Sequence, residues 1–376
     1  MQEFQPFVME RWMSNYEQDV NFNLSESGVE PMKLKELLVD HPGHIQHLME
    51  SRLNYPWVNG IPELRENIAN QYLGAKPENV LVTVGAIEAN YISINTLLSP
   101  GDEIVIMFPN YMQIWGIAKN LNLSLRTFNL IEKNNWAPDL DELEDIVSDK
   151  TKLIAICNPN NPTGYILTNT EMKRIVNIAS NANAWILSDE VYSGAERLFE
   201  KQTNSFYGLY NKVIAVGSTS KAYGLPGLRI GWAVGPENVI DEIWARHEYT
   251  AISATFLSNN LAAIALSPAM RHRIINRTRK YIRDGYPVLN EWVEKHKCNF
   301  SFVPPQAAAI AFVKYNMEIN STDFAERLYR EKSVLIVPGD HFGIDKYIRI
   351  SFGLPHEYLK EGLDKINELT EELESH

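Results

Sequence analysis

The sequence predicts an α/β fold with a mostly parallel central sheet in a large domain and a smaller α+β domain after it. Short runs rich in Val and Ile, each bounded by turn residues, indicate buried strands, and longer helical stretches separate them. Because strands and helices alternate, the sheet is expected to be parallel and covered by helices. The expected strands are residues 79–85, 102–108, 152–158, 184–190, 212–218 and 229–235.

The pattern along the chain also predicts its division into parts. Residues 86–98 and 169–183 are expected helices between the strands. After residue 285 the alternation stops, and helices are expected at 286–296, near 322–332 and at 356–373. We expect an N-terminal segment that joins the small domain and covers the active site, a large domain and a small domain. Their predicted bounds are 1–45, 46–285 and 286–376.

Length, charge and cysteine content exclude several classes of protein. A chain of 376 residues is long for a single core and indicates two domains. Its net charge of -12 argues against a nucleic acid partner and against a basic membrane-binding patch. Only Cys157 and Cys298 are present, so a secreted disulfide framework is not expected and a reducing cytoplasm fits. Residues 1–14 lack the signal-peptide pattern, and no apolar run approaches the roughly 20 residues that span a bilayer.

Ligands of parallel sheets bind at the carboxyl ends of the strands, so residues there are the first candidates for a site. Gly85 and Ala86 end one strand and open a helix, where backbone N–H groups and the helix dipole favour an anion. A tight turn would explain these small residues equally well. Tyr111 follows the next strand and is placed to stack on a planar ligand, although core packing is the alternative.

Two further strand ends carry polar side chains. The loop CNPNNPTG (157–164) contains Asn161, whose amide is a hydrogen-bond donor for a phenolate-type oxygen. Asp189 ends an apolar strand, where its carboxylate needs a cationic partner such as a protonated pyridine nitrogen. Tyr192 is three residues further on and is expected on the same face. A helix N-cap remains the other explanation of Asp189.

The stretch STSKAYGLPGLR (218–229) combines hydroxyls with two cations. Ser218, Ser220 and Arg229 are a natural set for a phosphate group. Lys221 between them is a candidate nucleophile that forms a Schiff base. A solvated loop lysine is the alternative, but it leaves the polar groups at the neighbouring strand ends unexplained.

Together, NPNNPTG, SDEVY and STSKAYGLPGLRIG resemble the fold-type I pyridoxal-phosphate (PLP) enzymes of the aminotransferase class I/II superfamily, from about residue 20 to 370. The resemblance implies PLP bound covalently to Lys221, with Asp189 keeping its pyridine nitrogen protonated. It implies that Tyr192 and Asn161 contact the phenolic oxygen and that Tyr111 stacks on the ring.

The same resemblance implies which residues bind the cofactor phosphate and the substrate. The residues implied to hold the phosphate are Gly85, Ala86, Ser218, Ser220 and Arg229. Tyr55 matches a tyrosine that reaches the phosphate of the neighbouring subunit, which implies a homodimer, or a dimer of dimers, with shared sites. Arg349, in YIRISFG, matches the arginine that binds the α-carboxylate of the amino acid substrate.

The segment NLSESGVEP (23–31) departs from ordinary aminotransferases, which have a stretch like NLGxGxPDF there. Ser25, Glu26 and Ser27 replace apolar and glycine positions, and Glu17 lies upstream. This block resembles the PLP- and O2-dependent arginine oxidases, including the arginine desaturases of indolmycin-like antibiotic pathways, and the capreomycidine-synthase group. That resemblance implies oxidation of L-arginine by dioxygen without a metal, to a dehydroarginine or 2-keto product with release of hydrogen peroxide.

The acidic residues give this interpretation a physical basis, because a guanidinium tail needs a carboxylate partner. Glu17 or Glu26 would supply it, with Ser27 and Asn161 beside the substrate; solvated surface residues are the alternative. A conventional aminotransferase, using a 2-oxo acid as the second substrate, fits the cofactor residues equally well. A non-catalytic protein of this fold is disfavoured, because Lys221, Asp189 and Arg349 are all present.

Overall fold

An eight-stranded sheet forms the centre of the large domain in the computed structural model, which describes residues 4–39 and 42–375. The strand order is β2-β9-β8-β7-β6-β3-β4-β5. The bounds are β2 (Val80–Thr83), β3 (Glu103–Phe108), β4 (Ser124–Ile131), β5 (Ala137–Pro138), β6 (Thr151–Cys157), β7 (Trp185–Asp189), β8 (Val213–Ser218) and β9 (Gly231–Val234).

All six predicted strands are present in this sheet, and the α/β prediction is confirmed. The four central strands β8, β7, β6 and β3 run parallel to one another, as does β4. The strand predicted at 229–235 is antiparallel, because β9 lies between β8 and β2 and opposes both. The sequence analysis did not identify β4 and β5, whose partly exposed residues lack a continuous apolar run.

The sheet is buried on both faces, which explains the continuous apolar runs. In β6, Leu153 and Ala155 belong to one hydrophobic cluster, while Ile154 and Ile156 belong to another. Successive side chains of a strand point to opposite faces, so each strand contributes to both clusters. Each face therefore needs a layer of helices.

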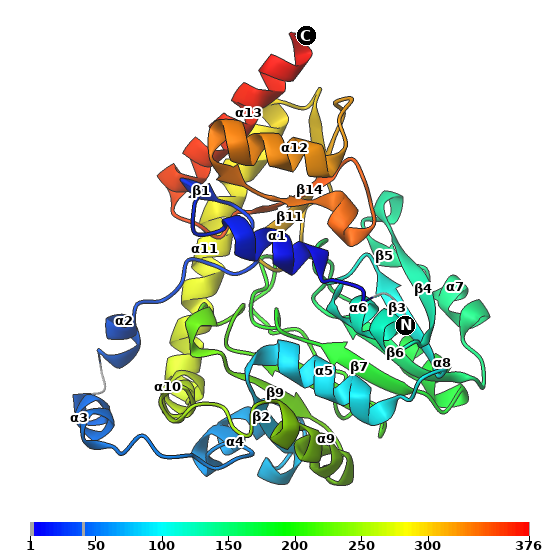
Figure 1. The fold of residues 1–376 in the computed structure, drawn as a ribbon, viewed down its shortest axis with the longest axis vertical. Coiled ribbons are helices and arrows are strands. Elements are labelled where there is room, and N and C mark those ends of the chain that lie inside the picture. The colour runs from blue at the N-terminus through cyan, green and yellow to red at the C-terminus, as the bar shows by residue number, and fades with distance from the viewer. Residues whose placement is uncertain (1–3, 40–41, 376) are drawn as a thin grey trace.

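Helices cover both faces of the sheet (Figure 1). The predicted helices 86–98 and 169–183 correspond to α5 and α8, and α8 begins at a capping box between Thr168 and Glu171. The helices of this part are α4 (Pro62–Ala69), α5 (Gly85–Leu97), α6 (Gln113–Asn120), α7 (Leu140–Ile146), α8 (Asn169–Asn181), α9 (Glu237–Thr250) and α10 (Phe256–Leu266).

A second, antiparallel sheet lies in the C-terminal part, in the order β10-β11-β14-β13. Its strands are β10 (Phe300–Phe302), β11 (Ile310–Tyr315), β13 (Val337–Pro338) and β14 (Tyr347–Ser351). Helices α12 (Ser321–Arg327) and α13 (His356–Glu374) lie beside it at the top of Figure 1. Both match helices predicted from the sequence, although a π-helical turn at Leu328–Lys332 follows α12.

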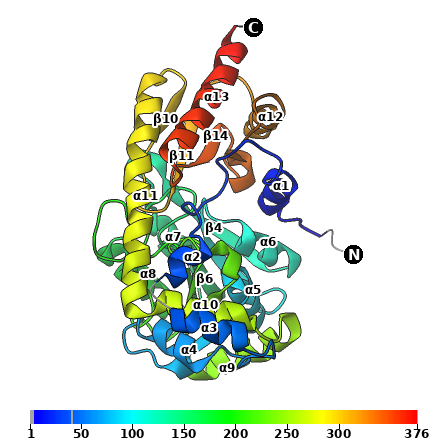
Figure 2. The same ribbon diagram turned by 90° about the vertical axis from the view of Figure 1, so that its left-hand side faces the viewer.

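The helix observed at the position predicted for 286–296 is much longer, and the predicted start at residue 286 was wrong. Helix α11 spans Pro268–Lys295 without a break and runs along both sheets (Figure 2). Pro287 lies inside it, and the expected break was placed near this residue. Gly285, also inside α11, lets the helix pack closely on the chain at Phe352, because a Cβ there would lie 1.7 Å from the carbonyl oxygen of Phe352. The predicted domain boundary at 285 therefore falls inside one continuous helix.

The N-terminal segment packs against the C-terminal part of the chain. Strand β1 (Phe22–Asn23) pairs in parallel with β12 (Val334–Leu335), and helix α1 (Val8–Tyr16) precedes it. The indole of Trp12 donates a hydrogen bond of 2.9 Å to the carbonyl oxygen of Ile336. Helices α2 (Leu34–Leu38) and α3 (Pro42–Glu50) then lead to the large sheet. Over residues 4–39 and 42–375, none of the helices is long and apolar enough to cross a bilayer.

Candidate active site

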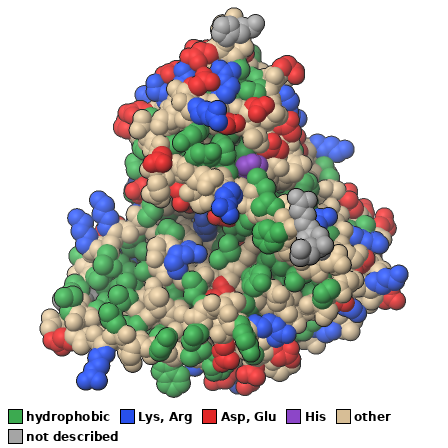
Figure 3. All heavy atoms as spheres, viewed as in Figure 1, with side chains coloured by type: hydrophobic (Ala, Val, Ile, Leu, Met, Phe, Trp, Pro, Cys, Tyr) green, Lys and Arg blue, Asp and Glu red, His purple; other side chains and the backbone are tan. Residues whose placement is uncertain are grey.

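A cavity of 280 Å³ lies at the carboxyl ends of the parallel strands, where the sequence placed the site. The molecular surface is hollowed near the centre of the face shown in Figure 3. Thirteen predicted residues line the cavity: Glu17, Glu26, Ser27, Ala86, Tyr111, Asn161, Asp189, Tyr192, Ser218, Ser220, Lys221, Arg229 and Arg349. The fold therefore brings together side chains that lie up to 332 positions apart in the sequence.

Lys221 follows the end of β8 and is partly buried, with a quarter of its side chain exposed. Its Nζ lies 3.8 Å from Oε2 of Glu26. A lysine in a solvated loop would not face a cavity lined by residues from four strand ends, so that alternative is disfavoured. The amine is positioned to act on a ligand inside the cavity.

Asp189 is buried at the end of β7, and burial raises the pKa of its carboxyl group. Asn90 Nδ2 donates a hydrogen bond of 3.0 Å to Oδ2, and the backbone N–H of Val191 lies 3.3 Å from Oδ1. These bonds, and the charge of Lys221, offset only part of the desolvation cost. A cation bound in the cavity would compensate the rest.

The other end of the cavity is built for an anion. Gly85 has a φ of +77°, and a Cβ at this position would lie 2.6 Å from Nη2 of Arg229. The guanidinium therefore lies against the first turn of the 13-residue helix α5. Arg229 Nη1 is 3.4 Å from Oγ of Ser220, whose own N–H donates to Oγ of Ser218 at 3.2 Å. Gly85 itself is not part of the cavity lining, but its lack of a side chain admits Arg229.

Arg349 is the largest fully buried side chain of the described residues, at 1% exposure. It lies on β14, and its guanidinium donates to Oδ1 of Asn161 at 3.1 Å and to the carbonyl oxygen of Ser25. Burial lowers the pKa of this guanidinium, because desolvation disfavours its charged form. Its Nε has no hydrogen-bond partner among the described residues. A carboxylate ligand would supply the missing charge and acceptors.

Tyr192 and Tyr111 hold the N-terminal segment in place over the strand ends. The hydroxyl of Tyr192 donates to Oγ of Ser27 at 2.9 Å, and that of Tyr111 donates to Oε1 of Glu10 at 2.6 Å. Burial raises the pKa of both phenols, so each is a donor at neutral pH. Two of the residues replaced in NLSESGVEP thus contact the site: Ser27 through Tyr192 and Ser25 through Arg349.

Three carboxylates from the N-terminal segment line the same cavity and are called the acidic wall below: Glu10, Glu17 and Glu26. The pKa of Glu17 is raised, first by burial and then by the negative charge of Glu26. Like charges held together in this way favour a cationic ligand between them. Helix α1 carries Glu10 and ends next to Glu17, so the acidic wall depends on the position of this helix.

The site residues fit PLP. The buried Asp189 carboxylate would hold the pyridine nitrogen in its protonated form, and the first turn of α5 with Ser218, Ser220 and Arg229 would hold the phosphate. Asn161 Oδ1 accepts from Arg349, so the side-chain amide of Asn161 would use its Nδ2 as the donor to the phenolic oxygen. The Lys221 amine would bind the aldehyde group.

Asn90 and Glu10 line the cavity but were not identified from the sequence, and Tyr55 was identified from the sequence but lies outside this cavity. Asn90 could have been found, because it lies four positions after Ala86 and hence on the same face of α5. Glu10 carried no such signal, because it is 101 positions from Tyr111. Tyr55 does not line this cavity and is 76% exposed, a position compatible with the predicted contact to another subunit.

Comparison with known proteins places this geometry in a family. The model of aminotransferase class I and II matches residues 19–366. The chain is similar to capreomycidine synthase of Streptomyces vinaceus, at 30% identity over 96% of this chain and 92% of that protein. It is also similar to an aspartate aminotransferase of Pyrococcus horikoshii, at 29% identity over 88% of each chain.

Solved structures agree with the family match. A PLP-dependent aminotransferase from Streptococcus suis superimposes with a TM-score of 0.92, at 33% identity over 99% of both chains. The PLP-dependent cyclase OrfR superimposes with a TM-score of 0.89, covering 99% of this chain and 98% of its own, at 23% identity, which shows the shared fold. The chain therefore belongs to the aminotransferase class I and II family of PLP-dependent enzymes.

Proposed function

We propose that this PLP-dependent enzyme oxidises L-arginine with dioxygen. The observation that carries the choice of substrate is the cavity itself, which has a buried Arg349 on one side and Glu10, Glu17 and Glu26 on the other. An amino acid with a carboxylate at one end and a guanidinium at the other matches this distribution of charge.

The residues have distinct tasks in this proposal. Arg349 binds the α-carboxylate through the guanidinium atoms that face the cavity, and so orients the substrate. Nζ of Lys221, which lines the cavity, would take the proton from the α-carbon of the substrate. Asp189 holds the proton on the pyridine nitrogen. PLP, when bound, withdraws electrons from the α-carbon of the substrate.

The use of oxygen rests on the likeness of NLSESGVEP to the arginine oxidases. Two electrons and two protons leave arginine and reduce O2 to hydrogen peroxide, so that dehydroarginine and H2O2 are formed in equal amounts. If dehydroarginine is then hydrolysed at its amino-bearing carbon, the products are a 2-keto acid and ammonium. The position of residues 23–31 next to the cavity supports this proposal, because Ser25, Glu26 and Ser27 all contact residues that line it.

Transamination is the second candidate, since several relatives are named aspartate aminotransferase. The acidic wall argues against aspartate in this chain. A second substrate carboxylate would face Glu10, Glu17 and Glu26, and burying like charges together costs free energy. An aminotransferase with this wall would still select a cationic amino acid.

Oxygen consumption decides between the two reactions. With L-arginine in air, the PLP-loaded enzyme is expected to consume O2 and to release H2O2 without any added 2-oxo acid. An oxygen electrode and mass spectrometry of the products measure this directly. An absence of oxygen uptake, together with amino transfer to an added 2-oxo acid, would establish the aminotransferase instead.

The acidic wall is tested in the same assay. Glu17→Gln and Glu26→Gln are each expected to raise KM for arginine by about tenfold, the loss of one charge-assisted hydrogen bond, with PLP binding unchanged. The exposed Glu63 on α4, changed to Gln, is the matched control. Because the pKa of Glu17 is raised, its carboxylate becomes protonated at higher pH than usual, and KM should rise as pH falls through that pKa. Unchanged arginine kinetics in both variants would remove these residues from the site.

We also propose that the enzyme is a cytoplasmic homodimer. Large hydrophobic side chains are exposed around the α3–α4 connection, including Leu53, Tyr55 and Trp57 at 79%, 76% and 62%. Figure 3 shows hydrophobic side chains gathered on the lower part of that face, over α3 and α4. A contiguous exposed apolar surface of this kind is typical of a protein interface. A second copy seated there would bring Tyr55 to the neighbouring site, as the family resemblance implies.

A further inference from the structure

A second cavity, of 460 Å³, lies behind the candidate active site. It is lined by residues 71–73, which follow α4, by the start of α8, by residues within 190–209 and by Trp232 of β9. Val191 and Ser218 line both cavities, so a ligand in the second one would lie next to a residue expected to hold the cofactor phosphate. Its volume is in the range of small-molecule sites.

The carboxylate of Glu190 faces this cavity with one of its two oxygens unused. Oε1 accepts three hydrogen bonds, from Oγ of Ser188 and Ser205 at 2.9 Å each and from the N–H of Phe206 at 3.0 Å. Oε2 accepts none from the described part of the chain. The side chain is only 6% exposed, and an ion so buried costs free energy unless a partner is present.

Aromatic side chains surround the same space. Tyr72, Tyr207, Tyr223 and Trp232 all line it. The rings of Tyr72 and Tyr207 are 6.0 Å apart in an edge-to-face arrangement, and the hydroxyl of Tyr72 accepts a hydrogen bond of 2.9 Å from the indole of Trp232. A carboxylate among aromatic faces is a favourable environment for an organic cation.

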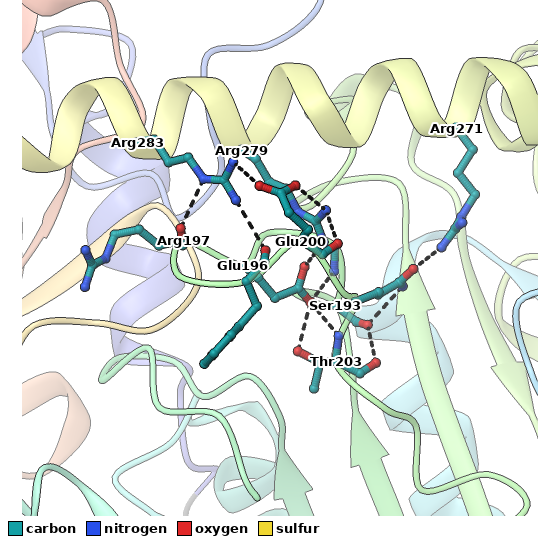
Figure 4. A network of polar contacts seen from close by, with 11 residues as sticks. Ser193, Glu196, Arg197, Glu200, Thr203, Arg271, Arg279 and Arg283 are labelled. Carbon is teal, nitrogen blue, oxygen red and sulfur yellow. Dashed lines mark hydrogen bonds and ion pairs between the residues drawn. The ribbon is translucent and has the colours of Figure 1, made fainter.

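The outer wall of the cavity is held by an ionic network beneath α11 (Figure 4). Arg279 on α11 forms a buried ion pair of 2.5 Å with Glu196, whose other oxygen accepts from the N–H of Thr203 at 2.7 Å. Gln202 donates to Oγ of Ser193 at 3.0 Å and accepts from Arg271. Ser193, Gln202 and Thr203 line the cavity, so its shape is fixed without a ligand.

We propose that this second cavity is a binding site for a small organic cation, a guanidinium or amine, which pairs with Oε2 of Glu190 between the tyrosine rings. The site is separate from the cofactor cavity and does not depend on which reaction the enzyme catalyses. Lys173 is the other charged residue of the lining; its side chain is exposed at the start of α8, where water screens its charge.

Butylguanidinium is a suitable probe, because it has neither the amine that reacts with PLP nor the carboxylate that Arg349 binds. Calorimetric titration of the full, PLP-loaded chain is expected to show saturable binding that includes one site per chain in the second cavity, in addition to any binding at Glu10, Glu17 and Glu26 of the active site. Glu190→Gln, which keeps an acceptor for Ser188 and Ser205, should weaken binding by at least about tenfold. Asn204→Trp, at an exposed lining position, should fill the cavity and abolish binding without disturbing the core.

The pH dependence gives an independent readout. Burial raises the pKa of Glu190 to about 7, so its carboxylate is present above that pH and is lost as pH falls. Affinity for butylguanidinium, which stays charged throughout, should therefore fall about tenfold between pH 8 and pH 6. The other titratable groups around Glu190 are Asp189, Lys173, Tyr72, Tyr207, Tyr223 and Arg271.

The control variant carries Glu17→Gln and Glu26→Gln together, which removes acidic charge from the other cavity. The butylguanidinium site of the second cavity should be retained in it, with the pH dependence set by Glu190, whatever binding the active site loses. If this variant loses the binding while Glu190→Gln and Asn204→Trp keep it, the probe occupies the active site and the proposal is wrong. An absence of saturable binding to the unmodified protein would overturn it as well.

Discussion

Lys221→Ala is expected to abolish turnover, with a fall of on the order of 10³-fold or more, and to remove the covalent bond to PLP. The physical reason is that Nζ of Lys221 has two tasks, attachment of the cofactor and movement of the proton at the substrate α-carbon. Among residues 4–39 and 42–375, Lys221 is the one lysine that lines the cavity. Borohydride reduction followed by peptide mass spectrometry should find PLP on the peptide that contains residues 218–229 in the unmodified protein and nowhere in the variant.

Lys212→Ala is the matched control for this change. Lys212 lies just before β8 and its Nζ donates to the backbone and side-chain oxygens of Asn183 on the surface. Its loss should leave the borohydride-fixed cofactor and turnover unchanged. A cofactor adduct retained in Lys221→Ala, or lost in Lys212→Ala, would contradict the assignment of Lys221.

Asp189→Asn is expected to reduce turnover by about 10²-fold to 10³-fold, because an amide cannot keep the pyridine nitrogen protonated. The stability of the protein should change in opposite directions with and without PLP. The pKa of Asp189 is raised in the folded chain, so its ionised form costs free energy above its usual pKa, and this cost disappears as pH falls through the raised value. Without PLP, the asparagine variant should therefore be the more stable protein at pH 7, by an amount that shrinks on acidification.

Thermal unfolding at several pH values, with and without PLP, measures this difference. PLP should raise Tm less in Asp189→Asn than in the unmodified protein, because the charge pair is lost. Asn90→Ala is the comparison variant, since it removes the hydrogen bond to Asp189 and keeps the charge. An equal stabilisation by PLP in the unmodified protein and in Asp189→Asn would show that Asp189 does not pair with the cofactor.

Much of the fold followed from the sequence because its signals are local. The apolar runs of the large sheet are short, β-rich and bounded by turns, and all six were found. The failures have equally specific causes. β4 alternates exposed and partly buried positions and lacks a continuous apolar run. The start of α11, which continues through Pro287, was placed 18 residues too late. Nothing local distinguishes a proline that a long helix accommodates from one that ends it.

The candidate cofactor residues could be proposed from the sequence, because several of them lie just after strand ends. Asp189, Asn161 and Lys221 occupy the same edge of the sheet as a consequence of parallel strands. The substrate side was only partly predictable. Glu17 and Glu26 were identified by their departure from the family pattern, but Glu10 enters the site only because α1 packs over Tyr111.

The sequence by itself predicted the sheet, the PLP cofactor and a set of candidate residues for it, since periodicity and strand-end chemistry are local properties of the chain. Only the tertiary structure decided the acidic wall and the second cavity. Both are made by segments far apart in the sequence: α1 over the strand ends in one case, and residues 71–73 against residues 190–209 in the other. Glu190 follows Asp189 directly, and successive side chains of an extended segment face opposite sides, so the two carboxylates enter different cavities; which groups surround each carboxylate is decided by the tertiary packing.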